Sequence, residues 1–174
     1  DTMKYGPWSF EFIHTPGHTI GHICLYEKNN KLLLTGDHIL PHISPNVSVD
    51  FEGKNSDALI QYMDSLKKVL KFETNIVLPA HEFAFKNLSE RVNELLQHHK
   101  DRLVEHMNSF SSKPMTAVEV ARKVSWNTGD FDNFNLMMKR SAIGETIAHL
   151  ELLVVNNQLA KINGGHKEVI WALT

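Results

Sequence analysis

Three short apolar runs in this chain each end at a histidine or an aspartate, and this pattern restricts the fold more than any other feature. The runs lead into residues 14–22 (HTPGHTIGH), 35–38 (TGDH) and 78–82 (LPAHE). Side chains at the ends of adjacent strands can meet at one point, so a sheet can assemble a metal site in this way. Histidine and carboxylate are the ligands expected for a catalytic zinc. The pattern therefore predicts a metal site at one edge of a sheet.

The order of the remaining elements favours an α/β fold. Apolar and polar residues alternate in the first expected strand, which indicates that one of its faces is buried. A helix over residues 56–71 separates the third expected strand from the fourth, and this alternation is typical of layered α/β architectures. Between them, residues 38–55 contain two prolines and a glycine and predict a long loop. The expected strands are residues 8–14, 21–26, 31–35 and 75–78.

A second long helix is expected over residues 87–108, with one apolar face. It contains His98, His99 and His106, which are tempting as metal ligands. Neighbouring residues on a helix point to different sides, so we do not expect this group to bind metal. His99 lies on the apolar stripe and is expected to be packed.

After this helix the character of the chain changes. Residues 109–114 are rich in serine and end in proline, which marks a linker. Three short helical patterns follow, and then two strands around Gly164 and Gly165, which predict a hairpin with a primed turn. Three helices followed by a hairpin is the order of a winged-helix module. The helical patterns contain Val120, Phe131 with Phe134 and Met138, and Ile147.

Charge argues against a nucleic-acid partner. The net charge is −2, and residues 115–174 carry six positive and six negative side chains. The third helix of the tail contains Glu145 and Glu151 but no lysine or arginine. Neutralising phosphates is the main source of nucleic-acid affinity, so we expect no nucleic-acid binding through this helix. Packing, or contact between two copies in a homodimer, is the expected use.

Composition also bounds the compartment. The single cysteine, Cys24, cannot form an internal disulfide and is expected in the core of a strand. A chain without disulfides fits a reducing cytoplasm, where we place the protein. No apolar run approaches the roughly 20 residues of a membrane span, so no membrane partner is expected.

Taken together, the three motifs resemble the metallo-β-lactamase superfamily, in which they follow in this order. The resemblance implies the C-terminal half of an αββα sandwich over residues 1–108, the linker 109–114 and a small winged-helix domain over residues 115–174. It also implies that His18, Asp37 and His81 are metal ligands. Asp37 would bridge two Zn²⁺ ions, with His18 on one and His81 on the other, and would act in catalysis by orienting the attacking hydroxide.

One motif of that family is missing. The His-x-His-x-Asp-His segment, which supplies further ligands and normally lies upstream, does not occur in this sequence. We therefore expect this chain to be the C-terminal part of a longer enzyme, with metal binding by the fragment weak or absent and the fragment itself inactive. His38 and His42 are the next residues to consider as ligands. His22 is expected either to support His18 or simply to pack.

With its tail, the whole chain resembles the lactamase-β-like protein 2 type of hydrolases within the superfamily. The resemblance implies a zinc-dependent hydrolase that attacks a small-molecule substrate with a metal-activated water. Three alternatives stay open at this point: an RNA-handling, endoribonuclease-like enzyme, a glyoxalase II-like thioesterase, and a non-catalytic dimerisation module. Esters, thioesters, lactones, β-lactams and phosphodiesters are all compatible with this metal arrangement.

Overall fold

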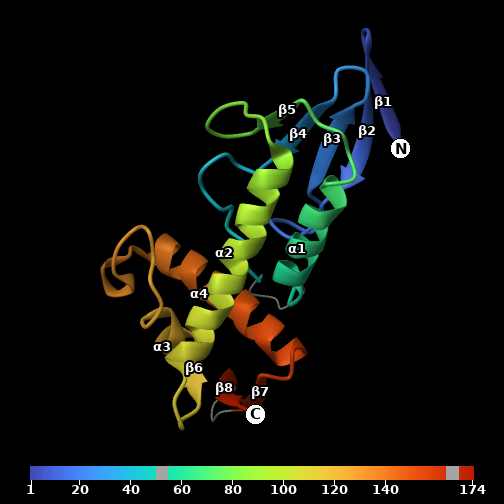
Figure 1. Cartoon of the computed structure of the whole chain (residues 1–174). Helices are drawn as coiled ribbons and strands as arrows, with labels where there is room; N and C mark the ends of the chain where they lie inside the picture. Colours follow the sequence, from blue (N-terminus) through green and yellow to red (C-terminus); the bar gives the residue numbers. More distant parts are fainter. Residues whose placement is uncertain (50–54, 164–168) are drawn as a thin grey trace. The chain divides into compact units, whose positions relative to one another are not determined.

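The structure, a computed structural model, describes residues 1–49, 55–163 and 169–174. The chain forms two compact units, each built from two segments, and Figure 1 shows the elements of both. Within the described part of the chain, none of the helices has the length and apolar character needed to cross a membrane. Unit 1 contains Asp1–Val47 and Ile60–His98, and unit 2 contains Ser48–Leu59 and His99–Thr174.

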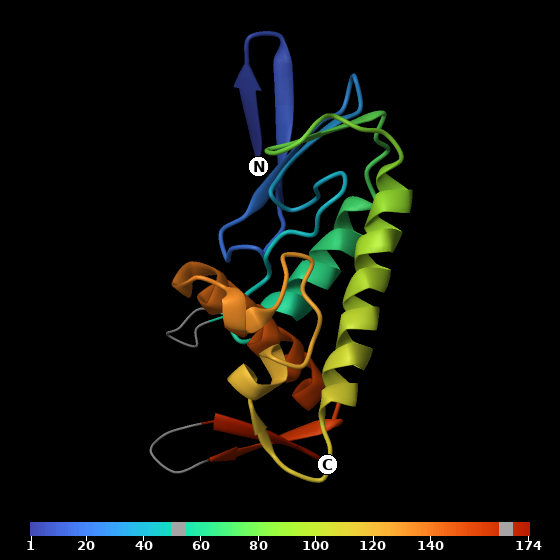
Figure 2. The ribbon, with the colours of Figure 1, turned by 90° about the vertical axis from the view of Figure 1, so that its left-hand side faces the viewer.

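Unit 1 contains a five-stranded sheet in the order β1-β2-β3-β4-β5. The first four strands pair antiparallel, and β5 pairs with β4 in parallel. The four expected strands are all present, with ends shifted by at most two residues. The hairpin of β1 and β2, seen clearly in Figure 2, adds a strand that the sequence did not predict. The strands are β1 (Thr2–Tyr5), β2 (Trp8–His14), β3 (Ile23–Glu27), β4 (Leu32–Gly36) and β5 (Ile76–Pro79).

Strand alternation places the core of unit 1 on one face of this sheet. Cys24 and Tyr26 of β3 lie on that face, opposite Ile13 and Leu33, and all four are buried. The helices α1 (Ala58–Val69) and α2 (Leu88–Ser109) contribute further buried side chains. Burial of Cys24 confirms its expected place in the core. The opposite face presents a row of half-buried apolar residues, Phe12, Leu25, Leu34 and Leu78.

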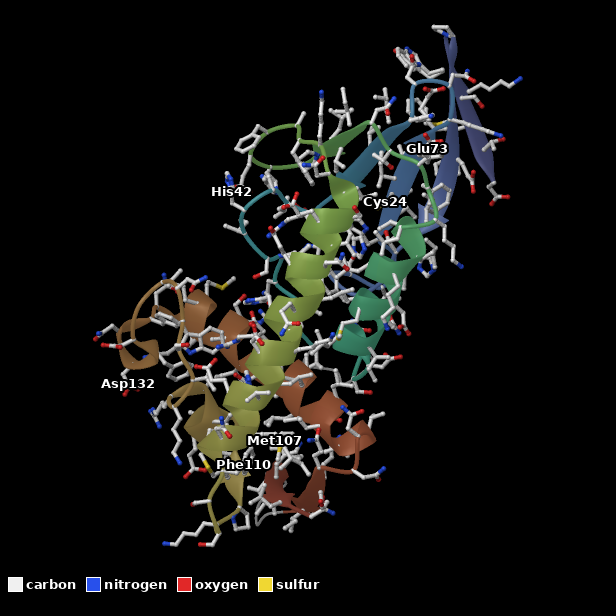
Figure 3. All side chains as sticks on the ribbon, viewed as in Figure 1. Cys24, His42, Glu73, Met107, Phe110 and Asp132 are labelled. Atoms are coloured by element: carbon white, nitrogen blue, oxygen red, sulfur yellow. The ribbon has the colours of Figure 1, made fainter. Side chains whose placement is uncertain are left out.

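Unit 2 combines two helices with a small antiparallel sheet in the order β6-β8-β7, of which β7 and β8 are visible in Figure 2. Its core gathers apolar side chains from the end of α2, from both helices and from the sheet, including Leu153 and Trp171. Met107 and Phe110 mark the α2 side of this core (Figure 3). The elements are β6 (Met115–Thr116), α3 (Ala117–Ala121), α4 (Leu136–Val155), β7 (Leu159–Asn163) and β8 (Val169–Leu173).

The prediction of a middle helix in the tail is wrong. Phe131 begins a single 3₁₀ turn, η1 (Phe131–Asn133), and Met138 belongs instead to the first turn of α4. The physical reason is Asn135, whose extended backbone and side chain, which accepts a hydrogen bond from the Met138 N–H at 3.0 Å, cap a new helix there. Phe131, Phe134 and Met138 keep a helical spacing although the chain leaves the helical conformation between η1 and α4.

Two further expectations concern the tail. The primed turn at Gly164 and Gly165 lies outside the described residues. The division into residues 1–108, a linker and a winged-helix domain stays a prediction, because the boundary between the compact units falls inside α2, between His98 and His99. His99 is buried, as expected for a packed residue, and His106 is buried as well.

Candidate metal centre

A tight loop between β2 and β3 presents His18. The Thr15 N–H donates to the His22 carbonyl at 2.9 Å and closes the loop. Gly17 has φ 138°, and a β-carbon there would lie 2.4 Å from the β-carbon of Tyr62 in α1. No other residue fits such a position without moving the helix. The Pro-Gly turn therefore fixes the backbone position of His18.

The ends of β4 and β5 bring Asp37 and His81 to the same edge of the sheet. Gly36, with φ 52°, ends β4, and a β-carbon on it would lie 2.7 Å from His22 Nε2. The Ala80 N–H donates to the Gly36 carbonyl at 2.9 Å, which ties the two strand ends together. Since Asp37 and His81 each follow the tied residue directly, their side chains start from neighbouring backbone positions.

The two histidines lie on different oxygens of the same carboxylate. His81 Nε2 is 3.1 Å from Asp37 Oδ1, and His18 Nε2 is 3.9 Å from Asp37 Oδ2. Asp37 Oδ1 is buried and has no hydrogen-bond partner among the described residues. The structure therefore brings together all three residues that the family resemblance singled out.

These three residues do not make a complete metal site by themselves. Among the residues that the structure describes, no group of three or more histidine, cysteine, aspartate or glutamate side chains is arranged to hold a metal ion. If Asp37 served two ions, each ion would receive one histidine and one carboxylate oxygen from this chain. A structural or catalytic zinc takes three or four ligands, so the ligand roles stay a prediction.

His22 lies behind the candidate ligands. Its Nδ1 is 2.8 Å from the Thr15 hydroxyl, which also lies 3.4 Å from the Cys24 sulfur. Its ring centroid is 6.3 Å from that of His18 and 5.7 Å from that of His38. Burial, together with the neighbouring His18, lowers the pKa of His22. The ring is thus packed beside His18 and His38, and support of His18 by His22 stays a prediction.

The two reserve candidates face different surroundings. His38 is fully buried, with its ring centroid 5.0 Å from that of Tyr62, and burial lowers its pKa to about 3. His42 is exposed, as Figure 3 shows, and its backbone N–H donates to the Glu82 carboxylate at 3.1 Å. His42 therefore pairs with the residue that follows His81, while His38 belongs to the core.

Three residues outside the candidate ligand set frame this site. The Asn46 carbonyl accepts a hydrogen bond from His18 Nδ1 at 2.8 Å. Arg91 donates to two carbonyls of the loop that follows Asp37. Glu82, with φ 69°, turns its carboxylate toward His42. Glu82 is adjacent to a motif histidine and Asn46 lies in the long loop expected after Asp37, whereas nothing in the sequence indicated Arg91.

Comparisons with known proteins identify the domain that carries these residues. Residues 2–81 match the family model described as "Metallo-beta-lactamase superfamily". These residues form a metallo-β-lactamase superfamily domain. The matched range contains His18 and Asp37 and ends at His81.

Curated relatives of this superfamily domain are longer than the chain. A "Lactamase-like protein nscB" from Arthroderma benhamiae is 34% identical over 90 residues, which are 52% of this chain and 18% of that protein. A "Probable metallo-hydrolase YqjP" from Bacillus subtilis is 25% identical over 149 residues, which are 84% of this chain and 44% of that protein. The chain thus spans less than half the length of these relatives.

Solved structures extend the likeness to both units. A beta-lactamase domain protein from Burkholderia ambifaria matches 100% of this chain and 50% of its own, with a TM-score of 0.87 and 28% identity. A metallo-beta-lactamase family protein from Thermus thermophilus matches 100% of this chain and 52% of its own, with a TM-score of 0.84 and 24% identity. The mixed α/β fold is therefore that of metallo-β-lactamase family structures, as expected.

Proposed function

We propose that the protein to which this chain belongs is a zinc-dependent hydrolase whose metal centre includes His18, Asp37 and His81. The observation that carries the proposal is the placement of His18 and His81 on different oxygens of Asp37. A carboxylate that bridges two ions, with one histidine on each, requires such an arrangement. The superfamily membership of residues 2–81 supports a hydrolase of this kind.

The donor set fits zinc. Imidazole nitrogen and carboxylate oxygen are both common zinc ligands. Asp37 Oδ1 is buried, and although His81 Nε2 lies 3.1 Å away, the pair makes no hydrogen bond. A buried carboxylate oxygen without a hydrogen bond is costly, and coordination of a cation would satisfy it. A separation of 3.1 Å between His81 Nε2 and Asp37 Oδ1 allows both atoms to bind the same ion.

Bound zinc would supply a water acidic enough to form hydroxide near neutral pH and would polarise the scissile bond. The contribution of this chain is to hold three side chains in place. The Asn46 carbonyl fixes the orientation of His18, and the Gly36 carbonyl aligns the segment that presents His81. Asp37 would orient the attacking hydroxide toward the substrate. A small molecule is the proposed substrate.

The proposal requires ligands from beyond this chain, because each ion would receive only two here. We therefore expect the 174-residue chain alone to bind zinc weakly or not at all. Calorimetric titration of the chain with zinc measures this directly. Nanomolar binding would show that the three residues recruit additional ligands within the chain, such as His42.

The decisive test uses a longer protein with the length of the relatives. We expect it to contain about two zinc ions per chain. In it, Asp37→Ala should remove most of the metal, as measured by elemental analysis, and should abolish hydrolysis of chromogenic ester, thioester and phosphodiester substrates. The matched control is Asp64→Ala, because Asp64 is an exposed aspartate on α1 that pairs with Lys67. Full metal content and full activity in Asp37→Ala would refute the proposal.

A further inference from the structure

The loop directly after Asp37, residues 38–46, lies beside the candidate metal centre and is held from the helix side by Arg91. Arg91 lies in the first turn of α2, and its side chain is only 13% exposed. Its Nε donates to the Leu40 carbonyl at 2.7 Å, and one terminal nitrogen donates to the Ile43 carbonyl at 3.0 Å. Its other terminal nitrogen pairs with Glu94 at 2.8 Å. One guanidinium thus fixes the middle of the loop at two points.

The far end of the same loop contacts His18. The Asn46 carbonyl lies 2.8 Å from His18 Nδ1. A carbonyl can only accept, so a proton must sit on Nδ1, and in the neutral ring this leaves the lone pair on Nε2. That Nε2 is the nitrogen that lies 3.9 Å from Asp37 Oδ2. The position of the Asn46 carbonyl therefore selects the tautomer in which His18 can bind a metal next to Asp37.

We infer that Arg91 is a positioning residue for His18: by holding Leu40 and Ile43, it keeps the Asn46 carbonyl behind His18 and so fixes the His18 tautomer. The importance of this role for catalysis rests on the proposed function. The tautomer of His18 is argued from the Asn46 contact alone. Arg91 lies outside the three motifs, and its side-chain hydrogen bonds go to the loop backbone and to Glu94. Its effect on His18 would therefore pass through the loop backbone.

The chemistry of the contact favours arginine at this position. The planar guanidinium presents several donors in a fixed fork, so it can serve two carbonyls and Glu94 at once. Lysine would keep the charge but offers a single ammonium group on a flexible stem. Removing the fork leaves the Leu40 and Ile43 carbonyls to be satisfied by water, and the loop can then leave its present path.

The experiment measures the His18 tautomer by NMR in the zinc-free chain, with ¹⁵N label in the imidazole rings. In the wild-type protein we expect the His18 signals of the Nδ1–H form. In Arg91→Ala we expect that pattern to be lost in favour of the Nε2–H form, and amide exchange across residues 38–46 to become faster. Arg91→Lys should give an intermediate result, and it serves as the main variant if Arg91→Ala does not fold.

The matched control is Glu94→Gln, which changes the third partner of the same guanidinium without touching the loop. It should leave the His18 signals as in the wild type. An unchanged His18 tautomer in both Arg91 variants would overturn the inference. So would an equal change in Glu94→Gln, because the effect would then come from α2 in general. None of these measurements needs metal or substrate, so failure here is distinct from retained metal and activity in Asp37→Ala.

Discussion

Two glycines allow the segments around the candidate site to pack closely against their neighbours. Gly17 lets the His18 loop lie directly on α1 at Tyr62, and Gly36 leaves room for the His22 ring behind Asp37. Both glycines have a positive φ, which other residues adopt only with strain. The motif glycines therefore have a steric reason that can be tested apart from catalysis.

Gly17→Ala should destabilise unit 1. The added β-carbon would lie 2.4 Å from the β-carbon and 2.5 Å from the α-carbon of Tyr62, and neither atom can move without shifting α1. We expect a loss of about 2 kcal/mol or more in the free energy of unfolding, measured by urea denaturation followed by circular dichroism. Gly21→Ala is the control in the same loop, because a β-carbon there meets no atom within 4 Å. Equal stability of the two variants would contradict this explanation.

At the residue scale, the sequence predicted the three side chains that meet but not the groups that orient them. His18, Asp37 and His81 follow apolar runs in a recognisable order, so their convergence could be expected. The hydrogen bond behind His18 comes from a backbone carbonyl, which any residue at position 46 would supply. Arg91 was equally hidden, since an arginine on an amphipathic helix usually lies in solvent.

At the scale of elements, α2 and α4 meet in unit 2 through three buried histidines. The His106 and His149 rings stack with centroids 4.7 Å apart, and His99 Nδ1 lies 3.3 Å from His149 Nε2. The charged groups beside them are Arg102 and Glu105 on α2 and Glu145 on α4. Burial lowers the pKa of His106 to about 4 and that of His149 well below its usual value.

Unit 2 should therefore lose stability in mild acid. A histidine whose pKa is lowered by folding binds its proton more readily in the unfolded chain, so its full contribution to stability exists above about pH 6.5. For His106 that contribution falls as the pH drops from about 6.5 toward 4. Urea denaturation should show this loss when it is followed by tryptophan fluorescence in a Trp8→Phe variant, which leaves tryptophan only in unit 2.

The variant His106→Phe isolates the titrating group. Phenylalanine can keep the ring stack with His149 but cannot take up a proton. We expect the slope of stability against pH between 6.5 and 4 to fall by up to about 1.4 kcal/mol per pH unit, the value for one proton. The same slope in wild type and variant would show that His106 does not contribute to the acid sensitivity.

Element prediction succeeded where burial and chain pattern agree. Strands β2 to β5 and helices α1 and α2 have clear apolar periodicity, and they were expected within a few residues of their ends. Strand β1 is short and all four of its residues are exposed, so only the Gly6-Pro7 turn before Trp8 could have indicated it. The break at Asn135 was missed because the apolar spacing of Phe131, Phe134 and Met138 crosses it without interruption.

For the whole molecule, the sequence could not decide what each sheet face contacts. Alternation along the strands identified the residues on each side of the sheet, but the coverage of a face depends on elements distant in the chain. One face carries Cys24 and Leu33 at no exposure, whereas the other carries the half-buried row of Phe12, Leu25 and Leu34. Relatives about twice as long, such as the Burkholderia ambifaria protein, contain additional chain that this sequence lacks.

The single parallel pairing in the sheet sets an order of assembly. Strands β2, β3 and β4 pair with neighbours in sequence, whereas β5 must first return across α1 to pair with β4. Contacts between distant parts of a chain form late, because closing the longer loop costs more entropy. In pulsed hydrogen exchange during refolding, amides of β3 should therefore gain protection before those of β5. The amide to follow in β5 is that of Ile76, because its N–H faces the Lys31 carbonyl directly before β4. Earlier protection of Ile76 than of Leu25 would contradict this order.

Such an order has a consequence for the candidate ligands. His18 and Asp37 flank strands that can associate early, whereas His81 arrives only when β5 docks. In a molecule caught midway through folding, His18 and Asp37 would be in place before His81, so only two of the three candidate ligands would be available to an ion. His81, the third candidate ligand, can thus contribute to a metal site only after β5 has joined the sheet.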